Sequence, residues 1–485
     1  MRRAARMVGA RTAPRLPAHQ ITTRDLGAAY PLVMEAGLGH RGVLVGRDLL
    51  GGSFVYDPFE LYAQQVVSSP NMIVFGQIGR GKSSFVKTYL WRQAVFGRRA
   101  WVVDPKGEYG PLAAAWGVRP VSLRPGGPVR LNPLDPGPPA RAGSPATPGG
   151  GSGSGHEAAR RQVELLGSLA AATLDRPLSP RERVAVELAL ASARSRREVV
   201  TIPAVVEAML APEADAARSI GTDRATLLED GRDVALELRR LVHGDLRGMF
   251  DGVTTAGIDL GAPLVVLDLS ALYDSAALGI LMVCATAWLQ AALVGARGTP
   301  IGAGPGVATG GSGHVLVVVD EAWAILANLA VARWLQASWK LSRAHGVSNI
   351  AVLHRLSDLR AVGAAGSQQV GLAEGLLSDS ETRVVFAQPP GEVHRAAELL
   401  SLSATEAELL PQLHRGVALW KVGSRSFLVQ HLLGQHERAI VDTDNAMRGV
   451  PGPASVPKPA SVPGPASAPK PASAPGPAPF PEDAW

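Results

Sequence analysis

The chain has 485 residues, of which 46% are hydrophobic and 19% charged, so it can bury a large core in roughly three domains of ~150 residues each. Its one cysteine, Cys284, excludes an internal disulfide and fits a reducing cytoplasm. The formal net charge of +6 permits contact with nucleic acid or an anionic membrane surface without requiring either.

The amino-terminal end is predicted to be disordered. Residues 1–20 are basic and contain proline, and no apolar run follows the first arginines, so this end lacks the pattern of a secretory signal. Residues 41–58 alternate in polarity and turn at Gly51 and Gly52, which predicts a β-hairpin that leads into the main domain.

The first motif with chemical content follows a short apolar strand at residues 72–75. It has the pattern G-x-x-x-x-G-K-S and precedes a helix predicted over residues 85–96, with Gly97 as its stop. In such a loop backbone N–H groups point at the β-phosphate, Lys82 bridges the β- and γ-phosphates, and the Ser83 hydroxyl binds Mg²⁺. The alternative is a merely glycine-rich turn. The predicted ATP-binding residues are Gly76, Gln77, Ile78, Gly79, Arg80, Gly81, Lys82, Ser83 and Ser84.

A flexible linker rich in proline and glycine is predicted over residues 133–155. The stretch 156–245 after it is rich in Ala, Leu, Arg and Glu, which predicts an all-helical insertion. Ser179 and Glu182 have the spacing of a capping box. Gly244 is predicted to end the last of these helices in a left-handed turn.

An uncharged segment at residues 276–296 has about the length that a bilayer requires. It lies between two short β-rich runs, where a crossover helix of an α/β fold belongs, and its alanine content suits packing against a sheet. We therefore expect a buried core helix here, with a membrane span as the alternative.

A second motif follows five apolar residues, 315–319, which are typical of a strand buried on both faces. Asp320 and Glu321 come next. Because ligands of open α/β sheets bind beyond the carboxyl ends of the strands, we expect Asp320 to hold Mg²⁺ and Glu321 to orient or deprotonate the attacking water. In the alternative interpretation Asp320 caps the following helix and Glu321 lies in its solvated first turn. The P-loop upstream favours the catalytic interpretation.

The remaining pattern predicts the fold class. Short β-branched runs alternate with helical ones, which predicts an α/β fold with a mainly parallel sheet, helices on both faces and an antiparallel hairpin at the end. The predicted strands are residues 72–75, 101–104, 264–269, 315–319, 350–353, 383–387, 417–421 and 427–430. Residues 450–485 repeat a Pro/Ala/Ser unit, which predicts a disordered, extended tail.

Four features together resemble the HerA/FtsK superfamily. They are the P-loop, residues 103–109 (VDPKGEY), residues 131–134 (LNPL) and residues 320–323 (DEAW). Within this superfamily the chain is most similar to the large VirB/TraC-type ATPase of conjugative type IV secretion systems, in the actinobacterial style. The resemblance covers roughly residues 40–435, and the order of the motifs is more specific than any one of them.

The resemblance implies a RecA-like P-loop NTPase core in two parts, residues 21–132 and 246–440, with the linker and the helical insertion between them. It implies ATP and Mg²⁺ as cofactors and a homo-oligomeric ring, either a hexamer or a smaller assembly. It also implies membrane-embedded secretion channel proteins as partners, a cytoplasmic location at the inner face of the cell membrane, and DNA or nucleoprotein as a further partner. Since the P-loop begins at Gly76, we expect the family's channel-attaching module on a separate chain.

Further residues complete the site in this superfamily. His354 follows the strand at residues 350–353, where the family carries a polar sensor, often glutamine; it either senses the γ-phosphate or is a polar strand end. Arg343 and Arg383 are the candidates for an arginine that neutralises phosphoryl charge in a neighbouring subunit's site. A solvated or ion-paired arginine is the alternative for each.

Three functions stay open on the sequence alone: a secretion or conjugation motor, a DNA-pumping translocase of the HerA/FtsK type, and a nucleotide-gated scaffold. The dispersed basic residues weigh against the translocase, and the set Lys82, Asp320 and Glu321 weighs against the scaffold. Asp104 and Glu108 are further candidates for contact with nucleotide, Mg²⁺ or a neighbouring subunit. We expect no metal beyond nucleotide-bound Mg²⁺ and no Ser/His/Asp hydrolase.

Overall fold

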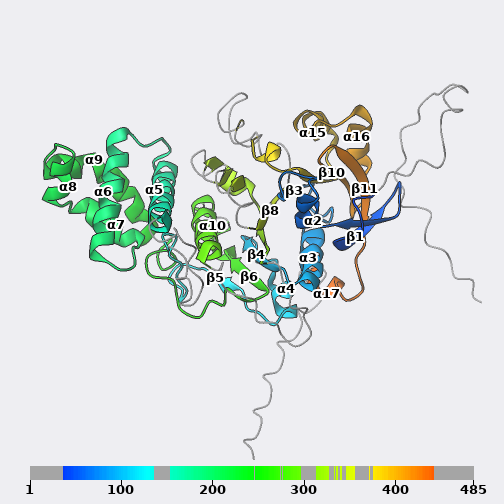
Figure 1. Ribbon diagram of the computed structural model, residues 1–485, viewed down its shortest axis with the longest axis horizontal. Helices are drawn as coiled ribbons and strands as arrows, with labels where there is room; N and C mark the ends of the chain where they lie inside the picture. The colour runs from blue at the N-terminus through cyan, green and yellow to red at the C-terminus, as the bar shows by residue number, and fades with distance from the viewer. Residues whose placement is uncertain are drawn as a thin grey trace, which may run out of the picture. The chain divides into compact units, whose positions relative to one another are not determined.

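The computed structural model describes residues 37–135, 153–295, 313–354, 371 and 375–441, apart from gaps at 245, 274, 276, 327–331, 334, 337–338 and 341–345 (Figure 1). The ends predicted to be disordered, residues 1–20 and 450–485, lie outside the described residues. So do residues 136–152 of the predicted linker.

A single sheet runs through the described residues. Its eleven strands lie in the spatial order β2, β1, β11, β10, β9, β3, β8, β7, β4, β6 and β5. The strands from β9 to β5 are parallel, and those from β2 to β9 pair antiparallel, which confirms the predicted mainly parallel sheet and the hairpin at its end. The bounds are β1 Val43–Asp48, β2 Ser53–Tyr56, β3 Met72–Phe75, β4 Arg99–Asp104, β5 Val121–Ser122, β6 Leu264–Asp268, β7 Val315–Val319, β8 Val347–Leu353, β9 Thr382–Phe386, β10 Val417–Val422 and β11 Arg425–His431.

Helices cover both faces of this sheet, because alternate side chains of its strands point to opposite sides. In β3, Ile73 and Phe75 belong to one hydrophobic core, whereas Met72 and Val74 belong to another. The first core includes side chains of α10 (Leu278–Gly295), and the second includes side chains of α3 (Lys82–Gln93) and α4 (Gly110–Ala115). The apolar strands predicted to be buried on both faces are therefore found so.

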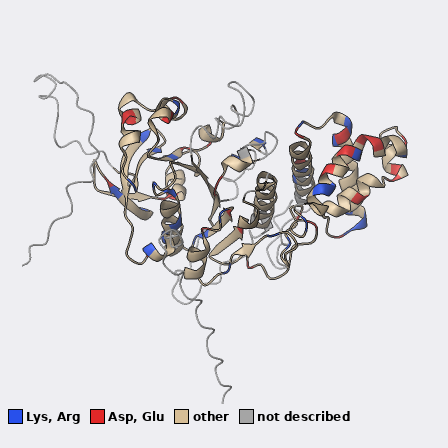
Figure 2. Ribbon diagram, turned by 180° about the vertical axis from the view of Figure 1, so that it is seen from behind, with Lys and Arg blue, Asp and Glu red and all other residues tan. Residues whose placement is uncertain are grey.

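The predicted helical insertion is described as five helices between β5 and β6. The capping box at the start of α6 is confirmed, since Ser179 Oγ accepts from Glu182 N and the Glu182 carboxylate accepts from Ser179 N. Basic and acidic residues are interspersed along these helices (Figure 2), and several of them form ion pairs, among them Arg197 with Glu207 at 2.8 Å. The bounds are α5 Gly153–Leu174, α6 Pro180–Arg196, α7 Ile202–Leu210, α8 Ala214–Ser219 and α9 Arg224–His243; the remaining helices are α2 Pro58–Ala63, α11 Trp323–Leu326, α15 Val393–Leu400, α16 Ala404–Leu409 and α17 Arg438–Val441.

One local prediction was wrong. Gly244 does not adopt a left-handed turn but has φ −95° and ψ −138°, and its N–H bonds to Arg240 O at 2.7 Å. A Cβ at Gly244 would lie 2.4 Å from that carbonyl oxygen, so the position needs glycine for close approach and not for a positive φ. The apolar segment predicted as a core helix forms α10, and the described residues include no helix that could cross a membrane.

The end of β11 gives a testable pH dependence of stability. His431 Nε2 lies 2.8 Å from Thr88 Oγ1, and burial, followed by the charge of Arg92, lowers the His431 pKa from 6.5 to about 4. Below pH 6.5 His431 is protonated in the unfolded chain, whereas in the folded chain it stays neutral down to about pH 4. We therefore expect stability to fall across this window, by up to ~3 kcal/mol, and His431→Gln to remove that part of the loss. Thermal unfolding midpoints of both proteins from pH 7 to 4.5 check this, and parallel curves would contradict it.

Candidate nucleotide-binding site

The loop between β3 and α3 has the backbone form that phosphate binding requires. Gly81 has φ +110° where it precedes α3, a conformation that residues with a side chain rarely adopt. Gly76 leaves no room for a side chain, since a Cβ there would lie 2.5 Å from Phe386 Cβ on the neighbouring strand β9. The first N–H groups of α3 therefore open onto the loop without intrahelical partners, as an anion site needs.

Lys82, the first residue of α3, points back into this loop. It is buried, and its ammonium donates to Gly76 O and, at 3.1 Å, to Gln77 O. Burial lowers the pKa of Lys82 to about 8, against the opposing effect of the Asp320 and Glu321 charges. An anion in the loop would stabilise the charged ammonium, so the site is suited to a phosphate.

The strand order brings the other predicted residues to the same edge of the sheet. Strand β8 lies between β3 and β7, and all three are parallel, so their carboxyl ends lie side by side. The P-loop follows β3, His354 follows β8, and Asp320 and Glu321 follow β7. On the other side of β7, the turn that contains Lys106 follows β4. This edge is where open α/β sheets bind their ligands.

The segment after β7 is pinned to both neighbouring strands. Asp320 N donates to Val103 O of β4 at 3.2 Å, and Ala322 N donates to Val352 O of β8 at 3.0 Å. Glu321 lies between these two bonds and adopts φ +52°, an uncommon value for a residue with a side chain. The backbone therefore fixes the direction of the Glu321 side chain.

Asp320 is the predicted Mg²⁺ ligand, and it is buried at the end of β7. Burial, followed by the negative charges of Glu321 and Asp104, raises the Asp320 pKa to about 7, and a divalent cation beside the carboxylate would offset this destabilisation of its charged form. The carboxylate of Asp320 and the hydroxyl of Ser83 are oxygen ligands of the kind that Mg²⁺ takes together with phosphate oxygens, so the residues fit the ion. Within the described ranges, no group of three or more His, Cys, Asp or Glu side chains could hold a metal by itself.

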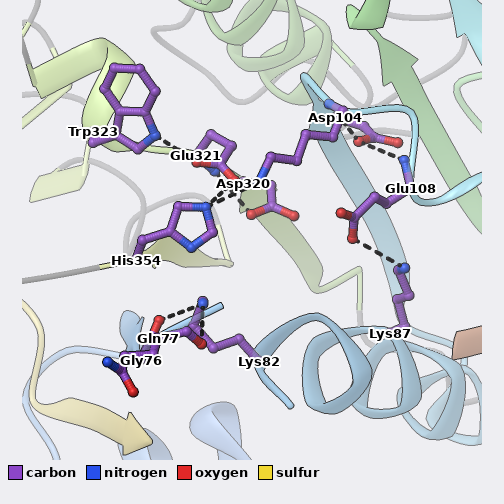
Figure 3. A network of polar contacts seen from close by, with 11 residues as sticks. Gly76, Gln77, Lys82, Lys87, Asp104, Glu108, Asp320, Glu321, Trp323 and His354 are labelled. Atoms are coloured by element: carbon purple, nitrogen blue, oxygen red, sulfur yellow. Dashed lines mark hydrogen bonds and ion pairs between the residues drawn. The ribbon is translucent and has the colours of Figure 1, made fainter. Parts of the chain in front are cut away.

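Glu321 is contacted by three donors (Figure 3). Trp323 Nε1 donates to Oε2 at 2.6 Å, whereas His354 Nε2, at 2.6 Å, and the Lys106 ammonium both contact Oε1. The Lys106 ammonium also lies 3.1 Å from the same His354 nitrogen. Burial alone would raise the Glu321 pKa, but the hydrogen bonds from His354 and Lys106 outweigh it and bring the pKa to about 2. Glu321 is therefore ionised at neutral pH.

A second charged group lies beside Asp320. Asp104 accepts backbone N–H bonds from Lys106, Glu108 and Tyr109 and so holds the turn after β4, while Glu108 pairs with the fully buried Lys87 of α3 at 3.5 Å (Figure 3). Burial raises the Asp104 pKa and lowers that of Lys87. Both carboxylates thus have partners within the chain, and contact with nucleotide, Mg²⁺ or a neighbouring subunit stays a prediction.

Of the two candidate arginines, the structure describes Arg383. Arg343 is outside the described residues. Arg383, in β9, donates to Ser380 O at 3.2 Å and Leu377 O at 3.0 Å, and burial lowers its pKa. It lies opposite Ile73, before the end of β3 at which the P-loop begins. These contacts hold the segment before β9, and the role of Arg383 in a neighbouring site stays a prediction.

Sequence reasoning assigned no role to Arg415 or Lys106. A cavity of about 520 Å³ beside the P-loop is lined by Gln77, Ile78, Gly79, Arg80, His354 and Arg415. Gly416 N donates to Arg80 O at 3.0 Å, which attaches the start of β10 to the loop and brings Arg415 to the cavity. No sequence signal near Arg415 indicates this contact. Lys106, in contrast, lies within residues 103–109, one of the features that carry the resemblance to the superfamily.

Comparison with solved structures finds similar folds. VirB4 of Thermoanaerobacter pseudethanolicus is 19% identical with a TM-score of 0.62, and the match covers 83% of this chain and 100% of that one. The plasmid coupling protein TrwB in complex with the ATP analogue ADPNP is 16% identical with a TM-score of 0.48, covering 88% of this chain and 96% of that one. No protein-family model and no curated protein matches.

The likeness to VirB4 is one of fold, and it agrees with the resemblance carried by the four sequence motifs. In this chain the P-loop follows β3 and the acidic pair follows β7 of the large, mostly parallel sheet. This chain has the RecA-like P-loop ATPase fold that VirB4 has.

Proposed function

We propose that this chain is an ATP-hydrolysing motor that powers type IV secretion or conjugative transfer at the cell envelope. The observation that carries the proposal is the meeting of Lys82, Asp320 and Glu321 at one edge of a sheet whose fold resembles that of VirB4. A scaffold without turnover has no need of a buried carboxylate that stays ionised beside a phosphate loop, so hydrolysis is the simplest use of this set.

In the proposed reaction the P-loop N–H groups and the Lys82 ammonium bind the β- and γ-phosphates of ATP. Ser83 and Asp320 would hold Mg²⁺, which would supply positive charge against the phosphates. Glu321 orients a water molecule toward the γ-phosphorus and accepts its proton as the bond to the β-phosphate oxygen breaks. His354, which follows β8 and lines the cavity beside the P-loop, is the proposed sensor of the γ-phosphate.

The proposed motor is a homo-oligomeric ring in the cytoplasm. It contacts membrane-embedded channel proteins at the inner face of the membrane. In such a ring Arg343 or Arg383 completes the site of the neighbouring subunit. The proposal favours a protein or nucleoprotein substrate over naked DNA, because charges of both signs are interspersed along the described helices α5–α9, with ion pairs such as Arg240–Glu237 at 2.8 Å.

Steady-state ATP turnover of the purified full chain, with and without single- and double-stranded DNA, tests the proposal. A secretion motor should hydrolyse ATP at a rate that naked DNA barely changes, since it awaits its protein partners. Strong stimulation by DNA that disappears at high salt would instead favour a DNA translocase, because phosphate contacts weaken steeply with salt. Nucleotide binding without turnover in any condition would favour the scaffold.

A further inference from the structure

The carboxylate of Glu321 is engaged in a way that conflicts with the role proposed for it. Oε2 accepts from Trp323 Nε1, and Oε1 contacts both the Lys106 ammonium and His354 Nε2. A carboxylate that two donors and a cation hold this closely is a poor proton acceptor, since protonation would break these interactions. Glu321 must therefore lose at least one partner before it can activate water.

Lys106 is the partner best able to leave. Trp323 lies only two residues from Glu321 on the same pinned segment, and His354 ends a central strand. Lys106 instead lies on the turn after β4, with 24% of its side chain exposed, and its ammonium is 3.1 Å from His354 Nε2. A lysine carries its charge on a flexible stem with three rotatable donors, so it can move to another anion without a change in the backbone.

A second anion site lies within reach of the same ammonium. The Lys106 ammonium lies 3.1 Å from His354 Nε2, and His354 lines the cavity beside the P-loop together with Gln77 and Arg80. The ammonium also lies 5.6 Å from the centre of the ring of Tyr273, which follows β6 in the chain. Lys106 is thus positioned between a carboxylate and a phosphate site.

We propose that Lys106 is a positioning residue that exchanges partners. It holds Glu321 in an unproductive pose through the ion pair, and the terminal phosphate of a nucleoside triphosphate on the P-loop draws its ammonium away and frees Glu321 Oε1 for water. This inference rests on the proposed ATPase function. It adds that the terminal phosphate of the nucleotide controls whether Glu321 is paired with Lys106 or free to activate water.

The indole of Trp323 reports this exchange without any need for hydrolysis. The full chain is labelled with 5-fluorotryptophan, and the ¹⁹F resonance of Trp323 is identified among the nine tryptophans by its loss in Trp323→Phe. We expect Lys106→Met to shift this resonance, and a non-hydrolysable ATP analogue with Mg²⁺ to move the wild-type resonance toward the Lys106→Met position, whereas ADP does not. An equal response to both nucleotides, or none to saturating analogue, would overturn the proposal.

Binding constants give a second readout. If Lys106 moves to the terminal phosphate, Lys106→Met should lower the preference for the ATP analogue over ADP by about tenfold, and Lys106→Arg should retain much of it. The matched control is Lys421→Met, which removes another half-buried lysine that is paired with Glu406 at 3.2 Å. An unchanged preference in Lys106→Met would refute the exchange. A wild-type chain that binds neither nucleotide would instead refute the proposed function itself.

Discussion

Glu321→Gln is expected to lower the ATP turnover number by about 10²- to 10⁴-fold while changing the affinity for a non-hydrolysable ATP analogue by no more than about threefold. Glutamine keeps the size of the side chain and one acceptor oxygen, but it cannot take the proton of the attacking water. The backbone bonds of Asp320 and Ala322 to β4 and β8 should keep the segment in place. Phosphate release under saturating ATP and equilibrium titration with the analogue measure the two quantities.

The matched control is Glu207→Gln, since Glu207 lies in α7 and pairs with Arg197 on the exposed surface of the insertion. Its turnover should equal that of the wild type. Turnover within a few-fold of wild type in Glu321→Gln would show that Glu321 is not the base, and Asp104 and Glu108, the neighbouring carboxylates after β4, would then be tested.

Lys82→Met is expected to weaken binding of the ATP analogue by about 100-fold or more, because it removes a buried cation from the phosphate site. The wild-type Lys82 pKa of about 8 adds a pH signature. Bound phosphate favours the charged lysine, so wild-type binding should take up a proton near pH 8 and weaken as the pH rises above it. Calorimetric titrations at pH 7 to 9.5, in buffers of different ionisation enthalpy, measure both effects.

Two comparisons separate this result from a folding defect. The thermal unfolding midpoint of Lys82→Met shows whether the loop is preserved, since the ammonium also bonds to Gly76 O and Gln77 O. Lys82→Arg keeps the charge in a larger planar group that the buried position should accommodate poorly, so it should restore binding only in part. If a folded Lys82→Met variant bound the ATP analogue as tightly as the wild type, the loop would not be the nucleotide-binding site.

Local rules explain why much of the fold was predictable. An uninterrupted apolar run such as residues 315–319 favours a strand buried on both faces, and the G-x-x-x-x-G-K-S spacing between a strand and a helix leaves the chain few conformations besides a phosphate loop. Caps behave alike: the Ser179–Glu182 box depends on four consecutive residues. The prediction for Gly244 was wrong because a position can require glycine either for a positive φ or for a close contact. Only the approach of the Arg240 carbonyl shows that the close contact is the reason here.

The sequence by itself therefore determined the strands other than the two-residue β5, the phosphate-loop pattern and the acidic pair after β7, since each depends on neighbours along the chain. Only the tertiary structure decided which side chains meet around Glu321. Lys106, Glu321 and His354 follow β4, β7 and β8, and their contact depends on these strands being adjacent and in register. Arg415 likewise reaches the cavity through one bond between Gly416 and Arg80. Such pairings arise from the burial of the sheet as a whole, which no short stretch of sequence encodes.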